Sequence, residues 1–592
     1  MYRDIKEKIA KKLQKITKLD YFICYNSLEK PKSAFGDLAC TIAFTIAKKE
    51  KKNPKQTAEE ISKKLKDKNI KKIETIGPYI NIYFSKEFFE NVLKNSSKNK
   101  KNKKTVIVEF PSVNPNKPWH IGHFRNAVLG NSVSQLMDSS GYTIIRMDYI
   151  DDLGLQVAQS LWEILNLNDK YDKKEKFDQW MGREYVKVAS KMEDLKVKKE
   201  VNDLLHKLEQ GDKKIAKKAR EISEKCVKAQ WETGFNFNIE HEILIFESDI
   251  MTFIFKEGLE YLKKNKIITL ETTGENKDCY VMKMSGGEFD KMKNPDKILI
   301  RSNGIATYTG KDIIFHLWKF GLLKSDFNLS NFITQPSGKI AHMSNKKGKK
   351  KKIIADKIVN VIGAEQTYPQ KVVKEGLKKL GHKKQAENYH HLAYEKVTLK
   401  NLNFSGRKGT WIGYSVDDFI KQGIEKALEK NCDDKKIAHT IATNSMIFYI
   451  LKYTPETKIA FNWEDALNLE GNSAPYVMYS YVRCKSILKN KKPSSKINMK
   501  NFEINNNERK LLLLLSQFSE TVEHSADELK PHEICDYLLR LSSEFASFYD
   551  VCPVLKATNK DAQNFRLLIL EKTAETLKKG MNLLGLTELE KM

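Results

Sequence analysis

The spacing of hydrophobic residues divides the chain into three blocks. Residues 1–95 mix helical patterns with short strands, and IETIGPYINIYF (73–84) alternates apolar and polar positions as a strand does. The lysine- and asparagine-rich stretch that follows predicts an exposed linker. Residues 105–415 alternate strand and helix patterns, which predicts a parallel α/β sheet. Residues 416–592 repeat apolar positions every 3.6 residues, which predicts an all-helical domain.

Two segments interrupt the α/β pattern of the second block. Residues 174–232 read as long charged helices, so we expect a helical insertion between two halves of the sheet. The segment SGKIAHMSNKKGKKKK (337–352) predicts a mobile basic loop, because lysine dominates it. An α/β domain followed by a helical bundle would suit an enzyme with a separate recognition module.

The charge balance indicates a polyanionic partner. Lys+Arg number 104 and Asp+Glu 76, a net charge of +28, which favours nucleic acid or an anionic membrane surface. A lysine-rich but merely solvated surface is the alternative. The eight cysteines form no CxxC pair, so neither a zinc site nor a disulfide framework is expected. Without an apolar run long enough for a signal peptide or a membrane span, we expect a cytoplasmic protein.

The strongest chemical signal follows the first strand of the second block. The strand ends near Phe110, a loop containing Pro and Asn follows, and a helix begins around His120. Ligands of α/β sheets bind at this edge, and a helix N-terminus attracts phosphates. His120 and His123 share one face of the first turn and can donate hydrogen bonds to phosphate oxygens. Gly122 leaves room for an adenine ring against the backbone.

These residues form the string HIGH (120–123), which resembles the ATP signature of class I aminoacyl-tRNA synthetases. The longer strings VNPNKPWHIGH and YIDDLGLQ resemble the arginyl branch. Further matches follow in the family's order: FGDLAC (35–40), GPYIN (77–81), RSNGIATYTGKDI (301–313), IGAEQTYPQKVV (362–373) and EGNSAPYVMYSYVR (470–483). The resemblance implies a tRNA-elbow domain over 1–95, a Rossmann-type catalytic domain over 105–415 and an anticodon-binding bundle over 416–592.

The resemblance implies that ATP, with Mg²⁺ as part of the substrate, drives the joining of L-arginine to tRNA(Arg). It implies a monomer, with no structural metal. A guanidinium carries five donors in a planar fork, so its selection calls for carboxylates and neutral acceptors. The family's arginine pocket falls on Glu247, Tyr308, Asp312 and Gln366. Asn114 and Ser112, assisted by Glu109, would hold the amino and carboxylate end.

Three segments compete for the second ATP signature, whose usual form is KMSKS: KMSGG (283–287), HMSNKKG (342–348) and NFSGRKG (403–409). The first fits the letters best, but the family's order favours the third. That segment has lost the usual lysines and offers Ser405, Gly406, Arg407 and Lys408. Lys117, three residues before His120, is expected to support the departure of pyrophosphate in their place.

The expected RNA contacts lie mostly in the last block. Tyr476 and Tyr479 would stack on anticodon bases, although core packing is the alternative for at least one of them. Arg483 would meet a phosphate, and the C-terminal Met592 occupies a position that reaches the anticodon in relatives. Asp37 belongs to the elbow module, where Thr41 departs from the family's pattern. Another HxGH nucleotidyltransferase, or a non-catalytic tRNA-binding relative, remains an alternative.

Overall fold

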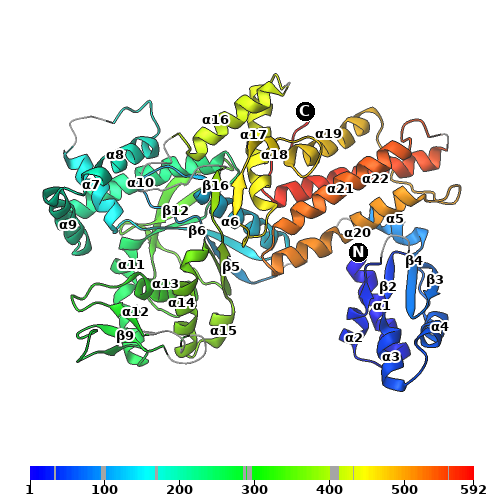
Figure 1. Ribbon diagram of the computed structural model, residues 1–592, viewed down its shortest axis with the longest axis horizontal. Coiled ribbons are helices and arrows are strands. Elements are labelled where there is room, and N and C mark those ends of the chain that lie inside the picture. The colour runs from blue at the N-terminus through cyan, green and yellow to red at the C-terminus, as the bar shows by residue number, and fades with distance from the viewer. Residues whose placement is uncertain are drawn as a thin grey trace.

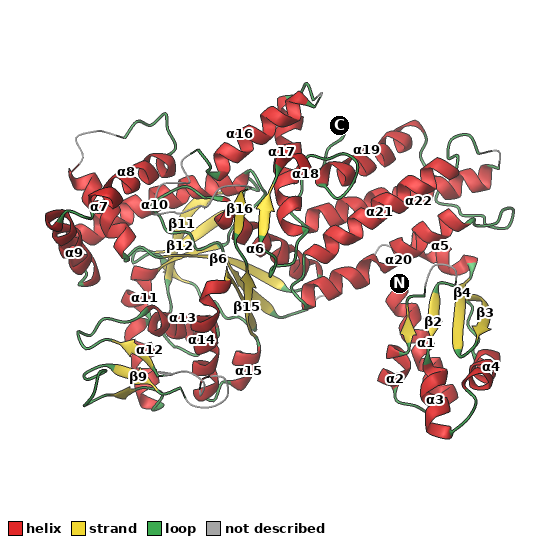
Figure 2. Cartoon of the chain, viewed as in Figure 1, coloured by secondary structure: helices red, strands yellow, loops and turns green. Residues whose placement is uncertain are grey.

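We describe the protein from a computed structural model, shown in Figures 1 and 2. The structure describes residues 1–31, 35–94, 102–166, 171–284, 289, 296–399, 413–430, 432–557 and 559–592. Within these residues, no helix combines the length and the apolar character needed to cross a membrane.

The N-terminal domain is an antiparallel sheet, ordered β1–β2–β4–β3, with helices packed on it. Its elements are α1 Tyr2–Thr17, α2 Tyr21–Asn26, β1 Leu28–Glu29, β2 Leu38–Cys40, α3 Ile42–Glu50, α4 Pro54–Lys64, β3 Ile70–Ile76, β4 Tyr79–Phe84 and α5 Lys86–Lys94. Residues 73–84 form a hairpin rather than the single strand that their alternation predicts, because Gly77 turns the chain with a φ of 57°.

The central domain contains a sheet of eight described strands in the order β13–β11–β12–β7–β6–β5–β14–β15. Their bounds are β5 Thr105–Glu109, β6 Thr143–Ile150, β7 Ile243–Phe246, β11 Asn328–Thr334, β12 Ile340–Ser344, β13 Lys349–Lys350, β14 Lys357–Gly363 and β15 Tyr389–Tyr394. From β12 to β15 all neighbours are parallel. This confirms the predicted Rossmann-type sheet.

The prediction of a mobile basic loop over residues 337–352 is wrong. Ile340–Ser344 is β12, which pairs in parallel with β7 inside the sheet, and Lys349–Lys350 is β13. Ala341 and Ser344 are buried, so this strand is held by its pairing and by its few inward side chains. Most of the lysines that suggested a loop lie after β12, and two of them, Lys349 and Lys350, form β13.

Helices cover both faces of the sheet and form the insertion. They are α6 Ile121–Ser139, α7 Leu155–Asn166, α8 Phe177–Lys191, α9 Leu195–Glu209, α10 Lys213–Phe235, α11 Glu247–Phe253, α12 Phe255–Lys264, α13 Tyr308–Lys319, η2 Ala364–Gln366, α14 Thr367–Lys379 and α15 Lys383–Glu387. Helices α8 to α10 are the predicted charged helices, and with α7 they enclose a separate core. A small sheet, β8 Thr269–Leu270, β9 Tyr280–Met282 and β10 Lys297–Ile300, precedes α13.

Within the described residues, the last block is a helical bundle with one short strand. Its elements are α16 Val416–Glu429, α17 Lys435–Leu451, β17 Ile459–Phe461, α18 Trp463–Ala466, α19 Ala474–Asn490, α20 Asn506–Asp527, α21 His532–Val551 and α22 Lys560–Leu583. Strand β17 pairs in parallel with β16 Val397–Leu399, so the block is not helical throughout as expected. In Figure 1 the N-terminal domain lies beside α20, at the far end from the insertion.

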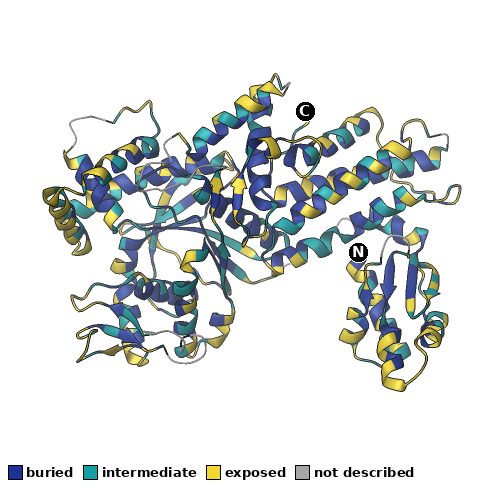
Figure 3. Cartoon of the chain, viewed as in Figure 1, coloured by how far each residue is buried: buried dark blue, intermediate teal, exposed yellow. Residues whose placement is uncertain are grey.

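Helix α6 lies in the centre of the molecule, where Figure 3 shows continuous burial. It contacts β5 and β14 on one side and α17, α20 and α22 on the other. Its side chains are therefore buried almost all round, from Phe124 to Met137. The sheet and the bundle together fix the position of the helix that His120 begins.

Candidate active site

The first turn of α6 orients two histidines. His120 is the N-cap, and its Nδ1 accepts hydrogen bonds from the backbone N–H groups of Gly122 (3.1 Å) and His123 (3.2 Å). The His123 Nδ1 accepts from the N–H of His120 at 3.4 Å, and the two rings stack with centroids 3.5 Å apart. A Cβ on Gly122 would lie 3.0 Å from the His120 ring, so glycine permits this cap.

Both histidines are neutral at physiological pH. Burial, with the nearby Lys117 charge, lowers the pKa of His120 to about 4, and burial beside His120 lowers the pKa of His123 well below its ordinary value. Because Nδ1 accepts a hydrogen bond in each ring, the proton lies on Nε2. The pair therefore offers two neutral Nε2–H donors at a helix N-terminus.

The loop before α6 converges on Gln156, a residue of α7 that was not singled out as a site residue, although it ends the quoted string YIDDLGLQ. Its Oε1 accepts from the side-chain amides of Asn114 (3.0 Å) and Asn116 (3.1 Å) and lies 3.5 Å from the Lys117 Nζ. The Lys117 side chain is only 8% exposed and its ammonium lies over the Tyr185 ring of α8. Lys117 is thus held in place by the insertion.

The same loop contains a left-handed residue. Ser112 has a φ of 55°, and its N–H donates to Asp148 Oδ1 at 3.1 Å. Asp148 Oδ2 accepts from the Trp231 indole of α10 at 2.8 Å, and burial raises the pKa of Asp148 to about 7. The backbone at Ser112 is therefore anchored to the sheet and to the insertion.

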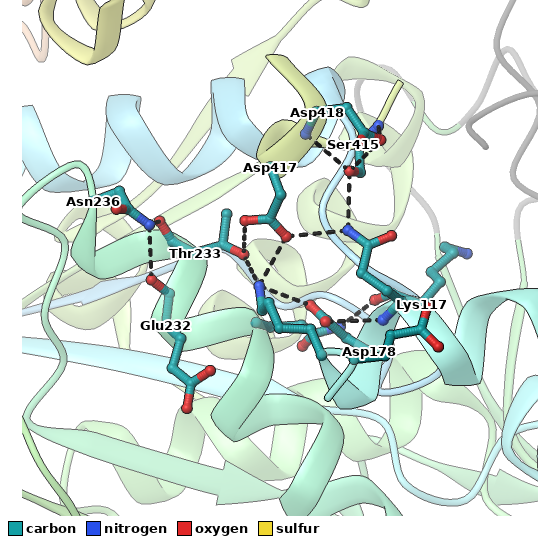
Figure 4. Close-up of polar contacts among 12 residues, drawn as sticks. Lys117, Asp178, Glu232, Thr233, Asn236, Ser415, Asp417 and Asp418 are labelled. Atoms are coloured by element: carbon teal, nitrogen blue, oxygen red, sulfur yellow. Dashed lines mark hydrogen bonds and ion pairs between the residues drawn. The ribbon is translucent and has the colours of Figure 1, made fainter. Parts of the chain in front are cut away.

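Figure 4 shows side chains of α8, α10 and α16 meeting around Asp417. Its carboxylate accepts from Lys176 Nζ (2.8 Å), Gln179 Nε2 (3.1 Å) and Thr233 Oγ1 (2.9 Å). Two residues earlier, Ser415 forms a β-bridge with His120. This junction ties the start of the C-terminal bundle to the insertion and to His120 at the start of α6.

Glu247, at the start of α11, is buried against two neighbours. Its carboxylate is ion-paired with Lys311 and accepts a hydrogen bond from the Tyr149 hydroxyl of β6. Burial, with the nearby charge of Asp151, raises the pKa of Glu247 to about 7. The Tyr308 hydroxyl lies 3.4 Å from Asp151 Oδ2, and its side chain is 60% exposed. The carboxyl ends of β6 and β7 therefore carry a cluster of acceptors, and Glu247 is no solvated surface acid.

Asp312 lies one helical turn after Tyr308 on α13. Burial and the neighbouring Glu109 charge raise its pKa to about 7, against the opposing effect of Lys319. Glu109 is itself ion-paired with the buried Lys319 at 2.5 Å. Gln366 is exposed at the end of η2, directly after β14, which neighbours β5 in parallel. The four expected pocket residues, Glu247, Tyr308, Asp312 and Gln366, therefore lie on elements around the carboxyl edge of the sheet.

The segment favoured for the second ATP signature, with Ser405, Gly406, Arg407 and Lys408, lies outside the described residues. Of its competitors, Lys283 is ion-paired beside the small sheet with Glu271 (2.7 Å) and Asp296 (3.0 Å). HMSNKKG begins inside β12 and is not the loop that was expected.

The expected anticodon residues lie on and beyond α19. Tyr476 is half-buried, whereas Tyr479 is 48% exposed. The Arg483 guanidinium lies 5.8 Å from the Tyr479 ring and 4.0 Å from the Tyr549 ring. Met592 is exposed at the chain end. Tyr479 thus presents an aromatic surface beside a cation.

Asp37 does not face solvent as an RNA contact would. It is 2% exposed, accepts from the Phe84 N–H at 2.6 Å and is ion-paired through both oxygens with Arg509 of α20. We therefore correct the expected role of Asp37. Its carboxylate joins the N-terminal domain to α20 of the bundle through the pair with Arg509. Because both oxygens are engaged and buried, neither is available to RNA.

Comparisons with known proteins agree along the chain. Residues 3–84 match the model of the arginyl tRNA synthetase N terminal domain, residues 88–345 that of the class I (R) tRNA synthetase catalytic domain, and residues 477–592 that of the DALR anticodon binding domain. The arginine–tRNA ligase of Thermococcus kodakarensis is 39% identical, covering 95% of this chain and 94% of that protein. That of Thermus thermophilus is 31% identical, covering 95% of each.

Solved structures agree as well. The chain resembles Thermus thermophilus arginyl-tRNA synthetase with a TM-score of 0.87 at 29% identity, covering 100% of both chains. It resembles the Plasmodium falciparum arginyl-tRNA synthetase with a TM-score of 0.75 at 19% identity, covering 100% of this chain and 99% of that one. The second likeness concerns the fold alone.

Proposed function

The chain belongs to the arginyl-tRNA synthetases of class I, and we propose which of its residues act at each step. The enzyme joins L-arginine to tRNA(Arg) and converts ATP to AMP and diphosphate. The arginine carboxylate attacks the α-phosphorus, diphosphate leaves, and the 2′-hydroxyl of the terminal adenosine then displaces AMP. Positioning and charge stabilisation carry most of such chemistry.

In the first step the Nε2–H groups of His120 and His123 donate to ATP phosphate oxygens as charge builds on them. Lys117 stabilises the departing diphosphate. Support for the histidine roles comes from their tautomers, which leave both Nε2 protons free of the backbone contacts at Nδ1. Ser405, Gly406, Arg407 and Lys408 complete the ATP site. Mg²⁺ accompanies ATP as part of the substrate, since this ion is usually held by substrate phosphates rather than by an all-protein cage.

Arginine binds between Glu247, Tyr308 and Asp312, with Gln366 beside them and with Asn114, Ser112 and Glu109 at its amino and carboxylate end. The observation that carries this assignment is the pair of carboxyl groups with raised pKa values, Glu247 directly after β7 and Asp312 in the second turn of α13. A cation stabilises such a carboxylate, and a guanidinium can supply donors to both groups at once.

On the RNA side, Tyr476, Tyr479, Arg483 and Met592 meet the anticodon loop, over a bundle that spans 416–592. Residues 1–95 meet the tRNA elbow and 105–415 form the catalytic domain. We propose that the protein works as a monomer in the cytoplasm.

Charging of tRNA with labelled arginine tests the proposal, with lysine and glutamine as control amino acids. We expect charging with arginine alone, and its loss in Asp312→Ala but not in Asp203→Ala on the exposed face of α9. Charging that persists in Asp312→Ala would remove that residue from the pocket. Tight tRNA binding without charging in the wild type would favour a non-catalytic tRNA-binding protein.

A further inference from the structure

The proposed guanidinium site already holds a cation from the protein itself. Lys311, on α13 between Tyr308 and Asp312, has a side chain that is 13% exposed and is ion-paired with Glu247. Its Nζ lies 4.8 Å from the centre of the Tyr308 ring, and its charge acts on Asp312. Of the three side chains assigned to the guanidinium, Glu247 and Tyr308 therefore contact an ammonium group, and Asp312 is within reach of its charge.

Both oxygens of Glu247 are engaged in this arrangement. Oε1 pairs with Lys311 and Oε2 accepts from the Tyr149 hydroxyl. A substrate cation that approaches this carboxylate must displace the Lys311 ammonium or share Glu247 with it. Sharing places two cations against one carboxylate in a buried site, which is electrostatically costly.

We propose that Lys311 is a specificity-determining residue, a resident competitor that the substrate must displace from Glu247. This inference rests on the proposed arginine pocket. An ammonium substrate such as lysine gains nothing by the exchange, because it offers Glu247 the same group that Lys311 already supplies. A guanidinium replaces one point charge with a planar fork of five donors that can bind Glu247 and Asp312 together. Lys311 thus selects against ammonium substrates, since specificity is a difference between two affinities.

Lys311→Met tests this role, because it keeps most of the side-chain length and removes the charge. Arginine- and lysine-dependent ATP–diphosphate exchange would be measured in the presence of tRNA, on the full chain. We expect the arginine-to-lysine ratio of kcat/KM to fall at least tenfold, mainly through a gain with lysine. Lys256→Met, on the exposed side of α12, is the matched control and should keep the ratio within twofold. An unchanged ratio in Lys311→Met would overturn the inference.

Lys311→Arg provides a second test that keeps the buried ion pair. A resident guanidinium competes with arginine on equal terms, so the arginine KM should rise at least threefold without any gain in lysine activation. An unchanged arginine KM would count against displacement.

Calorimetric titration of Glu247→Gln with arginine separates this inference from the pocket on which it rests. Arginine affinity equal to that of the wild type would overturn the pocket and the inference together. Weak arginine binding, combined with an unchanged ratio in Lys311→Met, would overturn the role of Lys311 alone.

Discussion

Arg125 fixes α6, the helix that carries the HIGH residues, to Glu395 before β16 and to the segment between α17 and β17, and its replacement by methionine should loosen that helix. The residue is fully buried on α6. Its guanidinium donates to four backbone carbonyls, those of Glu395 (2.6 Å), Thr457 (2.8 Å), Thr454 (3.0 Å) and Pro455 (3.0 Å). Burial lowers the pKa of Arg125 to about 10, so it remains charged at neutral pH.

The expected cost follows from these contacts. A hydrogen bond to a charged group contributes about 1.5–3 kcal/mol, so four independent bonds would sum to roughly 6–12 kcal/mol. Bonds made by one group are not independent, and removing one partner of a buried charged contact costs about 3–5 kcal/mol. We therefore expect Arg125→Met to lower the opening free energy of α6 by about 4 kcal/mol.

Native-state hydrogen exchange of α6 peptides, measured by mass spectrometry, reports that free energy directly. At about 1.4 kcal/mol per factor of ten, slow amides of Ile121–Ser139 should exchange about 10³-fold faster. Arg125→Lys keeps a charge with fewer donors and should show a smaller increase. Arg301→Met, at an exposed position, should leave exchange within about threefold of the wild type. An increase below tenfold in Arg125→Met would refute the reasoning.

Three further predictions concern the junction, the helix packing and the pocket. Asp417→Asn weakens the junction beside His120, so it should lower kcat for arginine activation about tenfold in ATP–diphosphate exchange. The arginine KM should stay within twofold of the wild type, and an unaltered kcat would contradict this role. Gly130→Ala places a Cβ 2.2 Å from the Phe110 ring and should lower the opening free energy of α6, measured by hydrogen exchange, by about 2 kcal/mol. Adding Phe110→Leu should restore at least half of that loss, and no recovery would show that the clash lies elsewhere. Because the pKa of Glu247 is raised to about 7, its carboxylate loses its charge as the pH falls from 8 to 6. The arginine KM should therefore rise several-fold over this range, and this pH dependence of KM should be smaller in Glu247→Gln.

Much of the catalytic framework is legible in the sequence because its signals are local. A β-branched run, a loop and a capped helix follow one another within about 20 residues, and the structure has β5 end at Glu109 and α6 begin after His120. The charged helices of the insertion are equally visible, since each carries its own 3.6-residue pattern.

Local composition misled where long-range pairing decides the structure. Strand β12 is short and borders a lysine run, and its pairing with β11 on one side and with β7, about 100 residues earlier, on the other places it inside the sheet. Asp37 lies in a recognisable motif, but its partner Arg509 is 472 residues away. No local sequence pattern predicts an ion pair between residues so far apart in the chain.

The sequence by itself determined the kinds of side chain available, their order, and the elements that carry them, and these sufficed to indicate the family. The tertiary structure decided which charges are buried together, as with Glu247 and Lys311, and which neutral acceptor, Gln156, gathers the loop before α6. Burial and pairing depend on segments that meet only after folding, and they set the protonation and the partners on which the chemistry of the site rests.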